Sequence, residues 1–97
     1  MIQHIVIFRW KEGISAEAID KAMAELAMLK GKIPGIAESS SVVNFSDRSK
    51  GFTHGLMGRF TNRAALDAYF PHPEHKRVVQ DFLDPIRLDT LVFDYEL

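Results

Sequence analysis

Hydrophobic and polar positions follow two kinds of pattern in the first third of the chain. Residues 2–10 are mainly β-branched and aromatic, which favours a strand. Ser15 follows a short turn and is a good N-cap for a helix. Apolar residues then recur at spacings of three and four, which predicts a helix with one buried face: Ile19, Ala22, Met23, Leu26, Leu29 and Ile33. We expect Gly31 and Pro34 to end this helix.

The rest of the chain repeats these patterns in shorter segments. Apolar stretches on either side of a polar turn predict two strands, and a similar stretch at the end predicts another: residues 39–45, 52–60 and 87–96. Thr61 is predicted to cap a short helix, and Pro73 suits the first position of a second one because its missing N–H costs nothing there. The order β-α-β-β-α-(α)-β is typical of an α+β, ferredoxin-like fold with a four-stranded antiparallel sheet.

Both faces of this predicted sheet carry large apolar side chains, although helices cover only one face of such a fold. The face without helices is predicted to hold Ile5, Ile7, Val43, Met57, Leu91 and Phe93. Exposure to water would forfeit roughly 1.5–3 kcal/mol for each, or on the order of 10 kcal/mol together. The chain therefore predicts a homodimer in which two sheets close into a barrel. The alternative is a monomer whose open face is partly polar, which would follow if the strand faces are assigned one residue out of register.

Composition and charge exclude several classes of protein. The 97 residues have room for one domain, which we expect to span residues 1–97. Twelve Lys and Arg against thirteen Asp and Glu leave a net charge of −1, which disfavours nucleic acid as a partner. The lack of cysteine excludes a disulfide scaffold, thiolate catalysis and a cysteine-type zinc site. No apolar run approaches the roughly 18 residues of a membrane span, so we expect a cytoplasmic protein with no membrane partner.

Histidines and a tyrosine share the layer between sheet and helices in this arrangement. His4 and His54 lie on the strand face assigned to the helices, and Tyr69 and His75 lie on inward helical stripes. An imidazole exchanges protons near neutral pH and a phenol donates to a carbonyl oxygen, which suits proton abstraction beside a carbonyl without a cofactor. We expect an apolar pocket completed by Met23, Leu26, Leu56, Thr90 and Val92. The alternative is that these rings are packed core residues.

Metal ligation has little support in the sequence. His72 and His75 are three residues apart, but Pro73 leaves His72 outside the helix, and no H-E-x-x-H motif exists. We therefore expect no metal and no cofactor. A three-histidine centre and a haem held by one inward histidine remain the alternatives.

Five short blocks carry a resemblance to a known family. They are HIVIF (residues 4–8), IPGI (33–36), GFTHGL (51–56), AYFPHPEH (68–75) and VFDYE (92–96). Together, in this order and spacing, they resemble the stress-responsive A/B barrel (Dabb) family over essentially the whole chain. The resemblance implies a dimeric α+β barrel.

The resemblance extends to olivetolic-acid-cyclase-like proteins, which close a linear polyketide by an aldol condensation without a cofactor. It implies that Tyr69 orients a carbonyl, that His75 is the general base, and that His4 and His54 belong to the site. The first helix departs from the cyclases, because Met23 and Leu26 stand where those members place aromatic residues. Some members also hold a magnesium ion on backbone carbonyls near the end of the first helix.

The sequence is compatible with three functions. The first is a homodimer that binds an apolar, carbonyl-containing small molecule, with acid/base catalysis of the polyketide-cyclase or lyase type. The second is a non-catalytic stress-response dimer with a ligand-binding or structural role. The third is cofactor-free oxygenation or haem handling, which related barrels perform.

Overall fold

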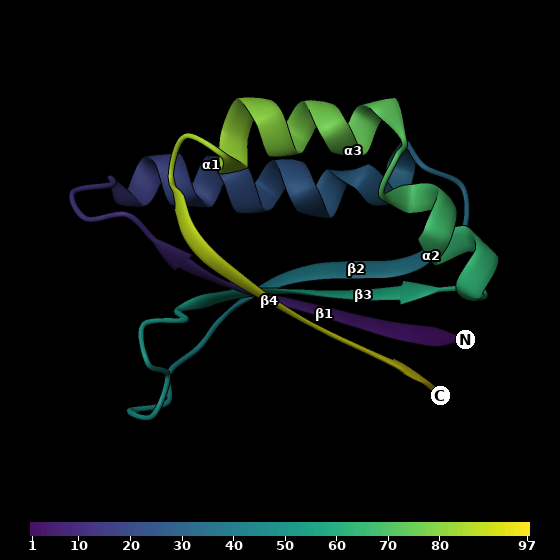
Figure 1. Ribbon diagram of the computed structural model, residues 1–97, viewed down its shortest axis with the longest axis horizontal. Coiled ribbons are helices and arrows are strands. Elements are labelled where there is room, and N and C mark those ends of the chain that lie inside the picture. The colour runs from purple at the N-terminus through teal and green to yellow at the C-terminus, as the bar shows by residue number, and fades with distance from the viewer.

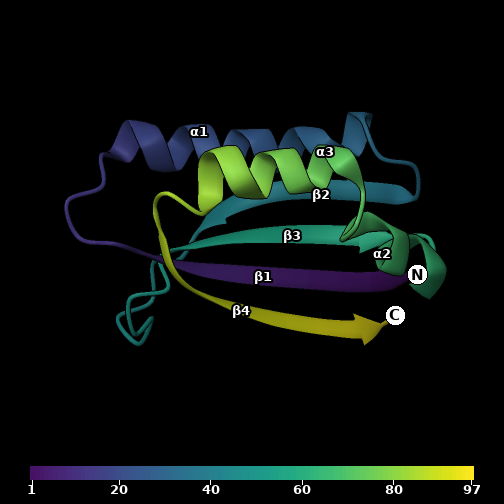
Figure 2. The ribbon, with the colours of Figure 1, turned by 45° about the horizontal axis from the view of Figure 1, so that its top comes forward.

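Four antiparallel strands form one sheet in the order β2-β3-β1-β4. The computed structural model describes all residues from Met1 to Leu97. The strands are β1 (Ile2–Trp10), β2 (Ile36–Val43), β3 (His54–Phe60) and β4 (Arg87–Glu96). This order, visible in Figure 2, confirms the predicted ferredoxin-like α+β fold.

The helices pack on one face of the sheet. They are α1 (Ala16–Ala27) with the 3-10 turn η1 (Met28–Gly31), α2 (Arg63–Tyr69), and α3 (Pro73–Val78), which continues into the π-helical turn η2 (Val79–Leu83). Figure 1 shows α1 and α3 side by side above the sheet, with no helix on the opposite face. No helix is both long enough and apolar enough to cross a membrane.

Helix α1 forms as its sequence predicts. The Ser15 hydroxyl accepts a hydrogen bond from the Ala18 N–H at 3.1 Å, which satisfies one of the free donors at the helix start. The predicted apolar stripe faces the sheet, and Ala22, Met23 and Leu26 are almost completely buried. They join residues of β1 and β3, including Phe8 and Phe60, in the single core between the layers.

Four predicted boundaries are wrong. Strand β2 runs from Ile36 to Val43 rather than over 39–45, and β3 starts at His54 rather than at 52. Strand β2 ends just before Asn44, which turns the chain away from the sheet. The Asn44 side chain donates to the Phe52 carbonyl and accepts from the Ser46 N–H. The cap of α2 is Asn62 rather than Thr61, since Asn62 Oδ1 accepts from the Ala65 N–H at 2.8 Å.

The strand register corrects one residue of the predicted open face. Val43 pairs with His54, which pairs with Phe8, so Val43 lies on the helix side. Val42 pairs with Gly55 opposite Ile7 and lies on the open face in its place. The alternation of β2 shows which of its residues share a face. Its run of serines does not show which face is inward.

Candidate active site

A cavity of about 250 Å³ lies between the sheet and the helices, where β1, β3 and β4 face α2 and α3. Nine of its thirteen lining residues are hydrophobic, so most of its wall is apolar. The polar lining residues are His4, His75, Arg87 and Thr90, and the Tyr69 phenol joins them. The cavity thus combines an apolar body with a few polar groups on regular elements.

Tyr69 ends helix α2 and is only 3% exposed. Its ring lies 4.4 Å from the His75 ring, centroid to centroid, because Pro71 and Pro73 turn the chain sharply between α2 and α3. Burial alone raises the pKa of Tyr69 to about 12. The hydroxyl therefore stays protonated near neutral pH and is available as a hydrogen-bond donor.

His75 is the third residue of α3 and is a neutral base near pH 7. Burial is the largest cause that lowers its pKa, and the charges of His4, Arg87 and His72 lower it further, while the bond to Phe70 raises it. Nδ1 lies 3.1 Å from the Phe70 carbonyl oxygen. Since a carbonyl oxygen only accepts, Nδ1 carries the proton and Nε2 is the atom that can take one from a substrate.

His4 is buried at the centre of an aromatic cluster. Its ring meets those of Phe60, Tyr69 and Phe70 edge-on at 5.6–6.0 Å. Its Nδ1 bonds a carboxylate oxygen of Asp94, which stands directly opposite on β4. The carboxylate fixes the orientation of the imidazole. The sequence pattern missed Asp94, although alternation along β4 places it on the same face as Thr90 and Val92.

Seven of the predicted site residues line this one cavity: His4, Leu26, Leu56, Tyr69, His75, Thr90 and Val92. The sequence pattern did not single out six further lining residues: Val6, Phe8, Phe70, Val79, Leu83 and Arg87. Val79 and Leu83 bound the π-helical turn, where Asp84 N–H bonds the Val79 carbonyl at 2.8 Å. Nothing in the local sequence marks that turn.

His54 and Met23 do not join the other predicted site residues, which corrects the expected convergence. They line a separate hollow of about 270 Å³, together with Asp20 and Ser41. The register explains the separation: His54 pairs with Phe8, four residues along β1 from His4, or about 13 Å. Two residues on the same face of a sheet can still lie far apart along the strands.

The His54 ring has its own hydrogen bonds. Its Nδ1 accepts from the Trp10 indole N–H at 3.0 Å and lies 2.7 Å from the Thr53 hydroxyl. Burial lowers the pKa of His54, and the Asp20 charge opposes that effect. The neutral ring therefore carries its proton on Nε2.

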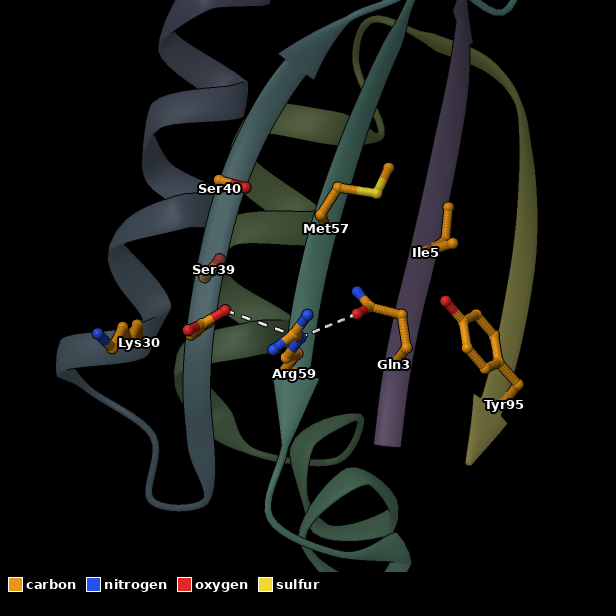
Figure 3. Close-up of a pocket in the computed structure, with 9 residues that line it drawn as sticks. Gln3, Ile5, Lys30, Ser39, Ser40, Met57, Arg59 and Tyr95 are labelled. Carbon is orange, nitrogen blue, oxygen red and sulfur yellow. Dashed lines mark hydrogen bonds and ion pairs between the residues drawn. The ribbon is translucent and has the colours of Figure 1, made fainter. Parts of the chain in front are cut away.

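The largest hollow, about 540 Å³, lies on the open face of the sheet. Figure 3 shows Gln3, Ile5, Met57 and Tyr95 standing on this face, with the helices behind the strands. Arg59 Nε donates to Gln3 Oε1 at 3.1 Å and pairs with Glu38 at 3.7 Å. No group of three or more His, Asp and Glu residues stands close enough to hold a metal.

Comparison with known proteins identifies the family. The profile described as "Stress responsive A/B Barrel Domain" matches residues 2–97. The chain belongs to the Dabb family. It is 30% identical over 95 residues to a stress-response A/B barrel domain-containing protein of Arabidopsis thaliana. That match covers 98% of this chain and 36% of the plant protein, so the Dabb chain spans about a third of the length of this relative.

Two solved structures are similar to this Dabb chain throughout. A hydroxynitrile lyase from Passiflora edulis is 26% identical, with a TM-score of 0.85, covering 97% of this chain and 90% of the lyase. A protein from Jannaschia sp. CCS1, described as dimeric and ferredoxin-like, is 31% identical with a TM-score of 0.82. That match covers 99% of this chain and 98% of the other. These matches agree with the predicted resemblance to the Dabb family.

Proposed function

We propose that the chain forms a homodimer that binds an apolar, carbonyl-containing small molecule in the cavity beside Tyr69 and His75. In this proposal the protein catalyses lyase or aldol chemistry by acid/base action and needs no cofactor. The observation that carries it is the contact between a buried, protonated phenol and a neutral imidazole in a mostly apolar cavity. The cytoplasmic location expected from the sequence remains a prediction, which cell fractionation tests.

The chemistry follows from the two ionisation states. The Tyr69 hydroxyl donates to the substrate carbonyl oxygen, while Nε2 of His75 takes a proton from the adjacent carbon. The electron pair of the broken C–H bond moves to the carbonyl oxygen, where the phenol stabilises the negative charge. The resulting enolate carbon can then attack a second carbonyl carbon, whose C=O π electron pair moves to its oxygen, and that oxygen takes the proton from His75. Without a second carbonyl, the enolate carbon recovers the proton from His75.

The lyase among the structural neighbours supports this class of reaction. The Passiflora edulis protein has the same fold over 97% of this chain and is named for a lyase activity on hydroxynitriles. Its identity of 26% leaves the substrate of the present chain open. A fold carries many functions, so the residues of the cavity rather than the neighbour's name decide the proposal.

Proton exchange tests the proposal without knowledge of the natural substrate. We expect the protein to catalyse deuterium uptake at the carbons beside the carbonyl of octan-2-one in D₂O, measured by NMR. His75→Ala removes the base and Tyr69→Phe removes the donor, so each should lower the rate by roughly 10²-fold or more. Tyr95→Phe, on the open face, is the matched control and should leave the rate unchanged.

The outcomes separate catalysis from binding. Exchange at the unmutated rate in both cavity variants would contradict the assigned roles of His75 and Tyr69. Saturable binding of the ketone in the cavity without exchange would support the second candidate, a non-catalytic ligand-binding dimer. The apolar lining favours this alternative independently of the two polar rings.

A further inference from the structure

The geometry points to an anionic ligand: a ketone or aldehyde with an apolar body and a carboxylate, which Arg87 and Thr90 bind at the β4 side of the cavity. This inference rests on the proposed function, because it names the chemical class of the molecule bound there. It assigns the carboxylate to Arg87 and Thr90, and the carbonyl to Tyr69 and His75.

Arg87 is the only lysine or arginine that lines the cavity, and no acidic residue lines it. Two carboxylates bond lining residues from outside the lining: Asp94 bonds His4, and Asp84 accepts from Arg87. A fixed positive charge beside an otherwise apolar space selects for a negative group on the guest. A neutral guest of the same shape would leave this charge without a partner inside the cavity.

The Arg87 guanidinium has N–H donors that are not used within the protein. It carries five N–H groups, of which Nη2 donates to Asp84 Oδ1 at 2.6 Å and Nη1 donates weakly to Thr90 Oγ1 at 3.4 Å. Because Thr90 Oγ1 accepts from Arg87, its own hydroxyl hydrogen is free for a ligand. Thr90 stands opposite Phe8 across β1 and β4, which places its side chain on the cavity face. A planar carboxylate suits this pair of neighbouring donors.

Asp84 does not remove the need for a ligand anion. Its side chain is 54% exposed, whereas that of Arg87 is 31% exposed. Water screens an exposed ion pair strongly, and such pairs contribute little. A carboxylate inside the cavity would meet the same guanidinium with less competing water, so its attraction would be stronger.

The anion would also act on the base. The positive charge of Arg87 is one of the causes that lower the pKa of His75. A bound carboxylate offsets this charge, so it raises the pKa of His75 toward the operating pH and makes the imidazole a stronger base. A ligand of the inferred class would thus improve the catalyst that acts on it.

Matched ketones test the inference. We would measure the affinity of octan-2-one and of its carboxylate relatives 2-oxooctanoate, 4-oxooctanoate and 7-oxooctanoate, which place the acid at three distances from the carbonyl. At least one acid should bind roughly tenfold or more tightly than octan-2-one. Arg87→Gln should remove this preference, so that the acid binds no more tightly than octan-2-one. Arg48→Gln, in the exposed β2–β3 loop, is the matched control and should change neither affinity.

Two further variants keep the test decisive if Arg87→Gln folds poorly. Asp84→Asn leaves Arg87 in place but removes its competing carboxylate, so the preferred acid should bind several-fold more tightly. Arg87→Lys should keep part of the preference because the charge remains and the planar donor pair is lost. A decrease in acid affinity in Asp84→Asn would overturn the role of Arg87.

The remaining outcomes separate this inference from the proposed function. If octan-2-one binds in the cavity and no acid binds better, the anionic ligand is wrong and the proposed function stands. If the acids are preferred equally in Arg87→Gln, the assignment to Arg87 is wrong. If neither the neutral ketone nor any acid binds, both the inference and the proposed pocket fail.

Discussion

Burial has opposite effects on the pKa values of the two central side chains and leaves both neutral. It raises the pKa of Tyr69 because the charged form of tyrosine is the deprotonated phenolate. It lowers the pKa of His75 because the charged form of histidine is the protonated imidazolium. A donor and a base in contact would ordinarily risk exchanging their proton. The apolar surroundings oppose such an ion pair and keep the phenol as donor and the imidazole as acceptor.

The pH dependence of exchange should show only one limb over most of the accessible range. The rate should fall only below about pH 6.5, the ordinary histidine pKa, where protonation of His75 removes the base. The lowered pKa of His75 moves this protonation to more acidic conditions. It should stay level from roughly pH 7 to roughly pH 10, since Tyr69 ionises only at about 12. Exchange by NMR across this range measures both limits. A rate that drops between pH 8 and 10 would show that the phenol ionises early and would contradict its role as donor.

Single residues show where sequence patterns stop being informative for this site. Helical and strand periods were enough to place His4, Tyr69 and His75 in one layer, because they fix which side of an element a residue occupies. They could not find Asp94 or Arg87, since the role of each depends on which residues lie opposite across β1 and β4. Their pairing partners are His4 for Asp94 and Trp10 for Arg87, and pairing between segments so far apart in the sequence leaves no local pattern.

Element boundaries depend on small hydrogen-bonding groups that compete for the same position. The sequence predicts a helix after Thr61, and both Thr61 and Asn62 are residue types that can cap it. The structure selects Asn62, with its backbone extended and its side chain on the Ala65 N–H. This cap fixes the start of α2, and α2 in turn carries Tyr69 into the cavity.

Substitution of the cap should therefore affect both stability and the site. Asn62→Ala should lower the free energy of unfolding by about 0.5–2 kcal/mol, measured by urea denaturation. Thr61→Ala, the neighbouring substitution, should cost less because its side chain makes no capping bond. Equal losses in the two variants would show that the capping bond does not hold this helix start.

Faces of strands were predictable where apolar residues alternate and unpredictable where they do not. The alternation of β1 and β4 placed Ile5, Ile7, Leu91 and Phe93 on the open face, as the register confirms. Strand β2 contains three consecutive serines between its apolar ends, so its inward face could be set only by pairing with β3. This is why Val43 was placed on the wrong side.

The whole molecule presents one face of its sheet without a covering layer. Leu91 is 55% exposed and Phe93 is 63% exposed on this face, where they pair with Ile7 and Ile5. An exposed apolar surface of this kind marks an interaction site, and a second copy would cover it symmetrically. The Jannaschia sp. CCS1 protein, which is described as dimeric, supports the same assembly for this chain.

Substitution at the open face tests the dimer. Phe93→Asp should raise the dissociation constant by roughly a hundredfold or more, because a two-fold interface loses the same buried ring twice. Analytical ultracentrifugation over a dilution series measures the shift. Met28→Asp replaces an equally apolar, half-exposed residue at the end of α1 and should leave the assembly unchanged. A protein that sediments as a monomer before any substitution would contradict the homodimer.

The location of a bound ketone tests the central claim most directly. Isotope-labelled protein titrated with octan-2-one should show amide and ring shifts in NMR spectra that centre on Tyr69, His75, Val79 and Thr90. The Nε2 resonance of His75 should move while its Nδ1 proton stays bonded to Phe70. Shifts that centre instead on Ile5, Met57 and Tyr95 of the open face would place the guest outside the cavity and contradict the account.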